Sequence, residues 1–328
     1  MSQTLEIACD ESGAEGEKLV GGNSDVFAHA SVLMDAETAT ACVAELRERA
    51  PTPATEYRAS HVLRGKHRAA LLWLLGPEGP VLGKVRVFLT DKLFYVAGKV
   101  TGLLEDDHAP RLGLDPHAAA TAAVLYREGP GAFGAERWAA LLDSFNYLLR
   151  AKNGQGVTTS VEETFRLVEE LRGAGGAAGE IMESLWRARA RVADFRERLL
   201  ADPYVFPALD PLIPAIVQAV TYWGAGGGPV SVVHDRQTTL TDERVAQMRR
   251  ILGGRMAGLR LVDSELDERV QVADVMAGVA RKIALDELAG RADPTLSALI
   301  RPYVDGSSIW AGGPGLTAPA GEAVPRSA

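Results

Sequence analysis

The sequence predicts an α/β protein with a mixed sheet, flanking helices and a large all-helical insertion. Three observations predict it: strand-like runs that each end in an aspartate, a long central stretch with helical periodicity, and a nearly all-apolar helix near the carboxyl terminus. With 328 residues, of which 47% are hydrophobic, the chain is long enough to bury a large core. We therefore expect one core interrupted by an insertion.

Alternating apolar and β-branched residues predict the strands. The runs span residues 4–9, 26–33, 84–89 and 229–235. Asp10, Asp91 and Asp235 stand where three of these runs end. Ligands of an open α/β sheet bind beyond the carboxyl ends of its strands, so the three aspartates would converge if their strands point the same way. Each aspartate alone is better explained as turn chemistry, through bonds to nearby backbone amides.

Apolar residues three and four positions apart predict helices, most densely between residues 96 and 222. The expected helices span residues 36–49, 118–126, 138–150, 161–171, 181–200, 212–223, 241–252 and 267–288, with a short strand at 259–262. Glycine-rich stretches at 173–179 and 226–228 mark flexible joints. The expected organisation is a core formed by residues 1–95 and 229–310, a helical insertion at 96–228, and a disordered tail at 311–328.

The net charge of −8 argues against a protein that coats nucleic acid or an anionic membrane through bulk electrostatics. A local basic patch would still provide phosphate contacts, and the arginine-rich stretches 187–198 and 244–260 are candidates, although the acids interleaved with them favour solvated helix faces. No apolar run approaches the ~20 residues that cross a bilayer, and no secretion signal opens the chain. We expect a cytoplasmic protein without membrane contact, with Cys9 and Cys42 as buried free thiols.

Asp274 lies in the most apolar of the expected helices, and a turn on either side of it nearly every residue except Gln271 is apolar or small. Gln271, Asp274 and Gly278 fall at i, i+3 and i+7 on one face, and Gly278 would let another backbone or a ligand come close. A buried carboxylate is costly unless it binds a metal ion or a cation such as Arg269 or Arg281.

Five motifs together resemble the DUF3800 family in order and approximate spacing, and they frame most of the chain. They are Asp10-Glu11-Ser12-Gly13, Glu56-Tyr57-Arg58, Asp91-Lys92, His234-Asp235, and Asp263-Ser264 followed by Gln271-Val272-Ala273-Asp274-Val275-Met276-Ala277-Gly278. The resemblance implies a ribonuclease-H-like fold and a metal-dependent nuclease activity. Arg58 stands where the family usually has a lysine, and arginine keeps the positive charge but is a poorer proton donor or acceptor.

Crowded carboxylates repel one another unless cations neutralise them. Magnesium prefers oxygen ligands, and two such ions would activate a water and stabilise the leaving oxygen in phosphodiester hydrolysis. We expect Asp10, Asp235 and Asp274 to be ligands of Mg²⁺ or Mn²⁺. Glu56 and Asp91 are further catalytic candidates.

Strand alternation directs Glu11 and His234 to the face opposite their neighbours Asp10 and Asp235, so neither is a preferred site residue. Two other functions stay open. One is a non-catalytic binding or assembly module in which the acids are structural. The other is a hydrolase or binder of a small phosphorylated ligand such as a nucleotide, which would need a closed pocket rather than a long groove with basic walls.

Overall fold

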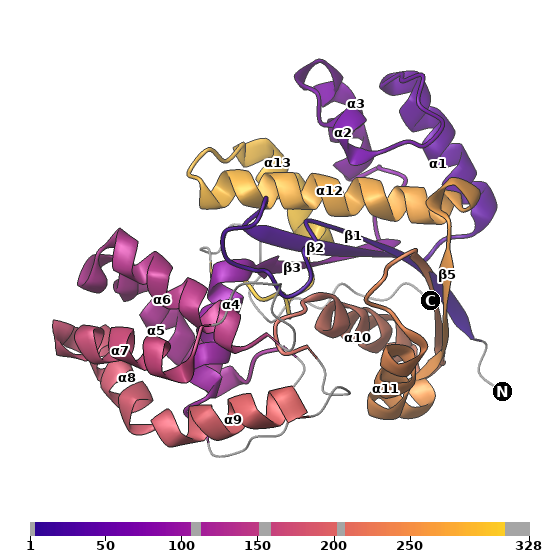
Figure 1. Cartoon of the computed structure of the whole chain (residues 1–328). Helices are drawn as coiled ribbons and strands as arrows, with labels where there is room; N and C mark the ends of the chain where they lie inside the picture. Colours follow the sequence, from indigo (N-terminus) through magenta and orange to yellow (C-terminus); the bar gives the residue numbers. More distant parts are fainter. Residues whose placement is uncertain (1–3, 106–112, 151–158, 202–206, 312–328) are drawn as a thin grey trace. The chain divides into compact units, whose positions relative to one another are not determined.

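The computed structural model describes residues 4–105, 113–150, 159–201 and 207–311 (Figure 1). The expected disordered tail, residues 311–328, lies outside the described residues except for Ala311. The chain divides into two compact units. The first unit consists of Met1–Ala14, Val26–Leu89 and Ala215–Ala328, and the second consists of Glu15–Asp25 and Thr90–Pro214. The helical insertion that we expected at residues 96–228 overlaps the second unit, but that unit begins earlier, at Thr90, ends earlier, at Pro214, and also includes Glu15–Asp25.

A five-stranded mixed sheet has the strand order β3-β2-β1-β4-β5. Its strands are β1 (Leu5–Ser12), β2 (Val26–Val32), β3 (Val85–Asp91), β4 (Val230–Asp235) and β5 (Met256–Val262). β1 pairs antiparallel with β2 and parallel with β4, and β4 pairs parallel with β5. The three strands that carry Asp10, Asp91 and Asp235 therefore belong to one sheet, and the predicted α/β class is confirmed.

The first strand is longer than predicted. We expected it to end in a turn at Asp10, but β1 continues to Ser12. The reason is the antiparallel ladder with β2, in which Asp10 pairs with Ala30 and Ser12 pairs with Ala28. Asp10 is thus held within a central strand, whereas Asp91 and Asp235 are the last residues of theirs.

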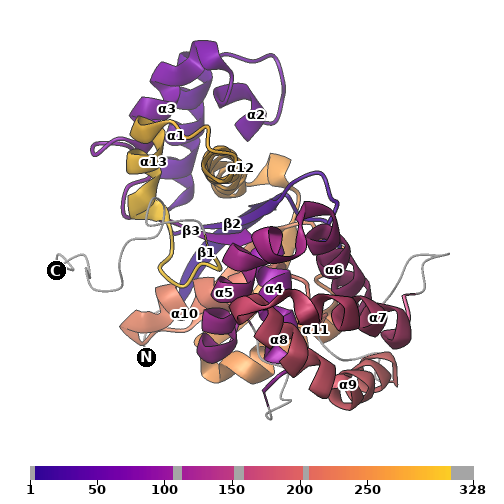
Figure 2. The same ribbon diagram turned by 90° about the vertical axis from the view of Figure 1, so that its left-hand side faces the viewer.

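The long helix α12 (Glu268–Leu288) packs across β1 and β2. Further helices after the first strands and at the carboxyl-terminal end are α1 (Ala36–Arg49), α2 (Ala59–Val62), α3 (Arg68–Leu75), α11 (Asp242–Leu252) and α13 (Pro294–Ile300). Figures 1 and 2 show α1, α3 and α13 on the same side of the sheet as α12, with α11 on the other side. The apolar side chains of α12 and of the facing strands form one buried cluster, which includes Ala8, Ala30 and Val233.

The second unit is helical. It contains α4 (Lys92–Gly102), α5 (Pro116–Phe133), α6 (Ala135–Leu148), α7 (Val161–Leu171), α8 (Gly176–Arg187) and α9 (Arg189–Ala201), and α10 (Leu212–Trp223) begins in it and ends in the first unit. The single helix expected at residues 181–200 is two helices, which meet at Ala188. Of the glycine-rich stretch 173–179, only the part up to Gly175 separates α7 from α8. Gly175 has a left-handed φ of 75°, and α8 begins at Gly176.

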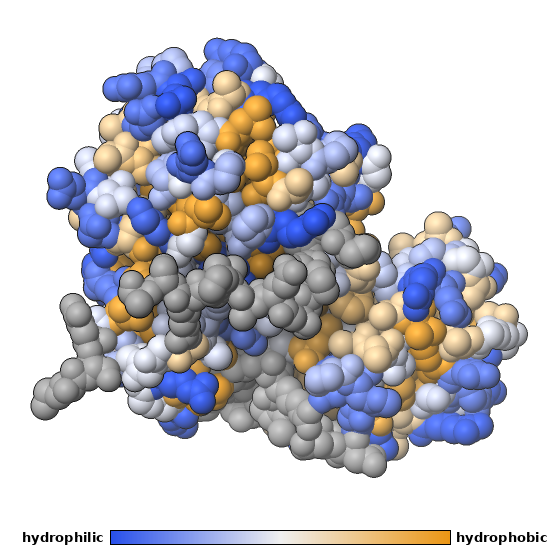
Figure 3. Space-filling model, turned by 180° about the vertical axis from the view of Figure 1, so that it is seen from behind, coloured by the Kyte–Doolittle hydropathy of each residue, from blue (hydrophilic) through white to orange (hydrophobic). Residues whose placement is uncertain are grey.

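No helix in the described part of the chain combines the length and apolar character that crossing a bilayer requires. On the face shown in Figure 3, blue hydrophilic residues lie among the orange hydrophobic ones. Cys9 and Cys42 are both buried and free, as expected.

Candidate functional site

Asp10 and Asp235 lie side by side on the face of the sheet that α12 covers. Ala8 and Val233 are packed in the cluster beneath α12, and alternation along the strands turns Asp10 and Asp235 to the same face. The parallel register pairs Ala8 with Val233 and Cys9 with His234. Continuing that register by one residue brings Asp10 level with Asp235, on strands that are about 4.8 Å apart.

Asp274 approaches these two aspartates from α12. Its Oδ2 accepts a hydrogen bond of 3.1 Å from the backbone N–H of Ala59, at the start of α2. Gly278, one turn further along α12, makes this approach possible, because a Cβ at position 278 would lie 2.3 Å from the Cβ of Ala59. The glycine that we expected to admit a neighbouring backbone thus admits α2.

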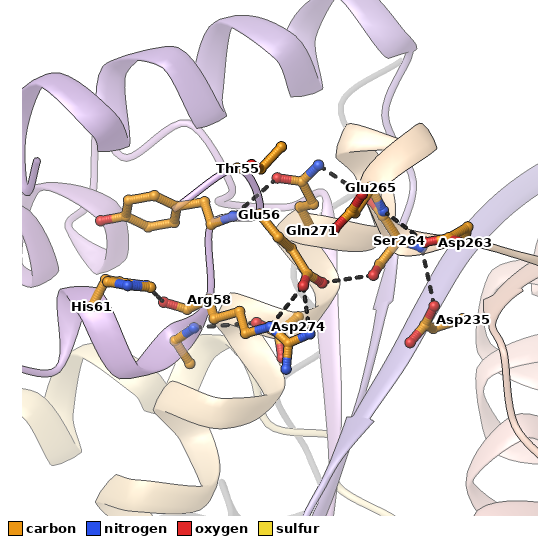
Figure 4. Close-up of polar contacts among 12 residues, drawn as sticks. Thr55, Glu56, Arg58, His61, Asp235, Asp263, Ser264, Glu265, Gln271 and Asp274 are labelled. Carbon is orange, nitrogen blue, oxygen red and sulfur yellow. Dashed lines mark hydrogen bonds and ion pairs between the residues drawn. The ribbon is translucent and has the colours of Figure 1, made fainter. Parts of the chain in front are cut away.

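Glu56 joins the group from the loop before α2, and Figure 4 shows its carboxylate between Ser264, Arg58 and Asp274. The Ser264 hydroxyl donates to Glu56 Oε1 at 2.6 Å, and Arg58 Nε donates to Glu56 Oε2 at 2.7 Å. The backbone N–H of Ser264 donates to Asp235 Oδ1 at 3.1 Å. Ser264 therefore links the Glu56 loop to the end of β4.

Gln271 holds the loops around this group in place. Its Oε1 accepts from the backbone N–H of Tyr57 at 3.3 Å, and its Nε2 donates to the backbone carbonyl of Ser264 at 3.2 Å. Gln271 is buried, so both polar ends of the amide are paired inside the protein. Gln271, which shares a helix face with Asp274, thus links Tyr57 to the short 3₁₀ helix Ser264–Leu266 by hydrogen bonds.

The carboxylates in this group affect one another's ionisation. Burial raises the pKa of Asp10 well above its ordinary value, and the negative charges of Glu11, Asp274 and Asp235 raise it further. Burial likewise raises the pKa of Asp274 to about 6, with Glu56 and Asp235 adding to the effect and the Ala59 N–H opposing it. Such repulsion among buried carboxylates is what a bound cation would relieve.

Arg269, one of the two arginines that we considered as structural partners of Asp274, bonds other carboxylates. The Arg269 guanidinium donates to Asp267 Oδ2 at 2.7 Å and to Glu6 Oε1 at 2.9 Å. Arg281 Nε donates to the Ser12 hydroxyl at 2.9 Å, although the charge of Asp274 still raises the pKa of Arg281 against the larger effect of burial. The alternative in which Arg269 pairs with Asp274 is therefore not found, and Arg281 lies within electrostatic range of Asp274.

A separate polar cluster occupies the other face of the sheet. The rings of His29 and His234 stack with centroids 5.4 Å apart, and His234 Nε2 lies 3.6 Å from Glu11 Oε2. Burial lowers the pKa of His234 to about 4 and that of His29 well below 6.5. Glu11 and His234 thus point away from Asp10 and Asp235, as alternation predicted, and both imidazoles are neutral near pH 7.

Asp91 is assigned to the second unit, where it has a local structural explanation. Its Oδ1 accepts a 3.0 Å hydrogen bond from the backbone N–H of Phe94 and so caps α4. Burial raises the pKa of Asp91 to about 6, and hydrogen bonds from Phe94 and Tyr126 oppose that rise. Because these contacts account for a buried carboxylate at this position, we do not include Asp91 in the site proposed below.

In ligand type alone, Asp10, Asp235 and Asp274 suit a hard divalent cation. All three supply carboxylate oxygens, which Mg²⁺ and Mn²⁺ prefer. Asp235 and Asp274 each commit one oxygen to a backbone N–H, and a metal ion would take the other. Across the described ranges, however, no three His, Cys, Asp or Glu side chains already stand in a metal-holding arrangement.

Of the two basic stretches, residues 187–198 belong to the second unit and several of their arginines have structural roles. Arg187 pairs with Glu183, and Arg191 and Arg196 donate to backbone carbonyls. In the stretch 244–260, Arg260 pairs with Glu6 and Arg249 donates to the carbonyl of Ala257. These contacts favour solvated and structural arginines, which was one of the two interpretations of the sequence.

Sequence patterns did not assign a role to Ser264 or Arg58. Both lie in motifs that resemble the family, but their partners come from distant segments: the bond from Ser264 to Glu56 spans 208 residues. No periodicity carries information on a contact of that kind. Comparison of the chain with protein families, with curated proteins and with solved structures found no match.

Proposed function

We propose that this protein is a divalent-metal-dependent nuclease that hydrolyses phosphodiester bonds at the site formed by Asp10, Asp235 and Asp274. The observation that carries the proposal is the approach of these carboxylates from β1, β4 and α12, with the pKa values of Asp10 and Asp274 raised. Perturbed carboxyls gathered from separate elements are typical of functional sites. The mixed sheet with its order β3-β2-β1-β4-β5 supports the ribonuclease-H-like fold that we infer from the DUF3800 resemblance.

Asp10, Asp235 and Asp274 would hold Mg²⁺ or Mn²⁺, which in such sites activates water and neutralises charge on the phosphate. The protein itself would supply fixed metal ligands and a proton acceptor. Asp10 and Asp235 are fixed by a sheet that is hydrogen-bonded on both sides of β1 and β4. Glu56 lies on a loop and is oriented by bonds from Ser264 and Arg58, and it would accept a proton from the attacking water.

The non-catalytic binding module is the second candidate, and one observation favours it. Asp235, Asp274 and Glu56 all accept hydrogen bonds from the protein itself, as structural acids do. A hydrolase of a small phosphorylated ligand would use the same carboxylates. We favour the nuclease because hydrogen bonds to one oxygen of each aspartate leave the repulsion among Asp10, Asp235 and Asp274 in place.

The test compares wild type with Asp10→Asn on single-stranded and duplex DNA and RNA, with Mg²⁺ or Mn²⁺. Wild type should cleave at least one substrate, chelator should stop it, and Asp10→Asn should lose the activity. Asp194→Asn, an exposed position on α9, is the matched control and should cleave normally. Cleavage that survives Asp10→Asn would reveal a contaminating nuclease. If no protein cleaves any polymer, hydrolysis of mononucleotides separates the small-ligand enzyme from the binding module.

A further inference from the structure

Arg58 stands at the solvent side of the candidate site. It precedes α2 with an extended backbone (φ −112°, ψ 155°), and its side chain is 63% exposed, whereas the carboxylate that it bonds, Glu56, is only 13% exposed. Figure 4 shows the guanidinium reaching back over the loop to Glu56, next to Asp274. An exposed arginine is therefore held against a largely buried acidic group.

The guanidinium is under the electrostatic influence of the whole group. The bond to Glu56 raises the pKa of Arg58 most, and the charges of Asp274 and Asp10 raise it as well. Arg58 is thus within electrostatic range of those aspartates. Its contacts within the described chain use Nε and one terminal nitrogen, both toward Glu56 Oε2. The remaining N–H groups of the five in a guanidinium point to no described protein acceptor.

Stability does not explain this arrangement. Arg58 is mostly exposed, so water and salt screen its pair with Glu56, and screened pairs contribute on the order of 1 kcal/mol or less. A planar guanidinium with free N–H groups is, by contrast, well suited to a phosphate, which it binds through two parallel hydrogen bonds. The negative carboxylates would otherwise repel such a ligand, so a cation at the mouth of the site is needed in addition to the metal.

We propose that Arg58 is a phosphate-binding residue, which turns from Glu56 to a non-bridging oxygen of the phosphate that the site receives. This inference rests on the proposed function, since the phosphate is placed by the metal at Asp10, Asp235 and Asp274. It makes the anionic phosphate, rather than the base or sugar, the part of the substrate that this arm of the site recognises. When Arg58 turns to the phosphate, Glu56 Oε2 also loses its bonds from the guanidinium and can accept a proton.

The experiment measures binding of inorganic phosphate by calorimetry at saturating Mg²⁺, after Mg²⁺ alone has been titrated into each protein. Arg58→Gln should weaken phosphate binding by about tenfold or more, and Arg58→Lys should weaken it less, because lysine keeps the charge but not the paired N–H groups. Affinity for Mg²⁺ alone should not fall in Arg58→Gln, since a positive charge near the metal has been removed. Arg64→Gln, an exposed arginine in the segment after α2, is the matched control and should bind phosphate normally.

Two outcomes would overturn the inference, and they differ in what else they affect. If wild type binds Mg²⁺ and Arg58→Gln binds phosphate as tightly as wild type does, the inference fails and the metal site stands. If wild type binds no divalent ion, the metal site fails and the inference fails with it. Melting curves of Arg58→Gln should superimpose on those of wild type, which shows that a loss of phosphate binding is not a loss of fold.

Discussion

Gly278 of α12 faces Ala59 of α2 so closely that a Cβ at position 278 would lie 2.3 Å from the Ala59 Cβ. We expect Gly278→Ala to push α2 away and destabilise the protein by about 1–3 kcal/mol, because a packed interface does not accept an added methyl without a backbone shift. The shift would also weaken the bond from the Ala59 N–H to Asp274. Denaturant unfolding measures the loss.

Gly131→Ala in α5 is the control for that substitution. A Cβ there meets nothing within 4 Å, so the change should be neutral or stabilise by roughly 0.5–1 kcal/mol, as helix propensity predicts. Equal effects at both positions would show that the contact between Gly278 and Ala59 does not constrain the site.

Asp274→Asn should abolish divalent-ion binding while leaving the fold intact or slightly more stable. The reason is that the substitution removes one of the buried charges that raise the pKa of Asp10. Thermal melts with and without Mg²⁺ are the measurement. Wild type should gain stability with Mg²⁺ and the variant should not.

A structural role for Asp274 predicts the opposite sign. Breaking a buried ion pair costs roughly 3 kcal/mol or more, so a large drop in melting temperature without metal would favour the binding module over the nuclease. Asp194→Asn, which changes an exposed carboxylate, should behave as wild type in both conditions.

Metal affinity should depend on pH through Asp274. Its pKa is raised to about 6, so protons compete with the cation and the apparent affinity for Mg²⁺ should fall as the pH drops below about 6. Protonation of Asp10, whose pKa is also raised well above its ordinary value, should add to this fall. Calorimetric titrations from pH 5 to 8 test this, and an affinity that does not change across that range would remove Asp274 from the set of ligands.

The buried histidines should make the protein less stable in acid. The pKa of His234 is lowered from 6.5 to about 4, so between these values the unfolded chain binds a proton that the folded chain does not. Stability is therefore lost as the pH falls through this window, by about 3 kcal/mol for His234. Asp274 acts in the opposite direction between about pH 6 and 4, because its folded pKa is raised.

His234→Gln separates the two effects, since only the histidine contribution disappears. The free energy of unfolding of the variant, relative to wild type, should rise as the pH is lowered from 7 to 4.5. A difference that is independent of pH would mean that His234 takes up its proton at the same pH in the folded and the unfolded protein, contrary to its burial beside His29.

Local signals predicted those elements whose ends are chemically marked. Asp35 caps α1 and Ser160 forms a capping box on α7, and both helices have the bounds expected from the sequence. The helices α3 and α4 were not predicted. Their sequences are apolar at most positions, so periodicity gives little contrast.

The site divides in the same way. Strand alternation and the apolar surroundings of α12 pointed to Asp10, Asp235 and Asp274, because those signals are local. The network that joins Glu56, Arg58 and Ser264 depends on how a loop near residue 56 meets a loop near residue 264, and that is decided by tertiary packing alone.

The connection between β1 and β2 has a consequence for how the chain reaches its native state. This loop, Glu15–Asp25, belongs to the helical unit, where the backbone N–H of Leu19 bonds to Asn146, 127 residues away. β1 likewise waits for its parallel neighbour β4, which is synthesised much later. Many of these pairings join segments that are distant in sequence, so the chain loses conformational entropy in closing long loops before the strand contacts stabilise it. We therefore expect refolding to be far slower than for a helical bundle of equal length. Until β4 is synthesised, one side of β1 is an unpaired edge, at which incomplete chains can aggregate.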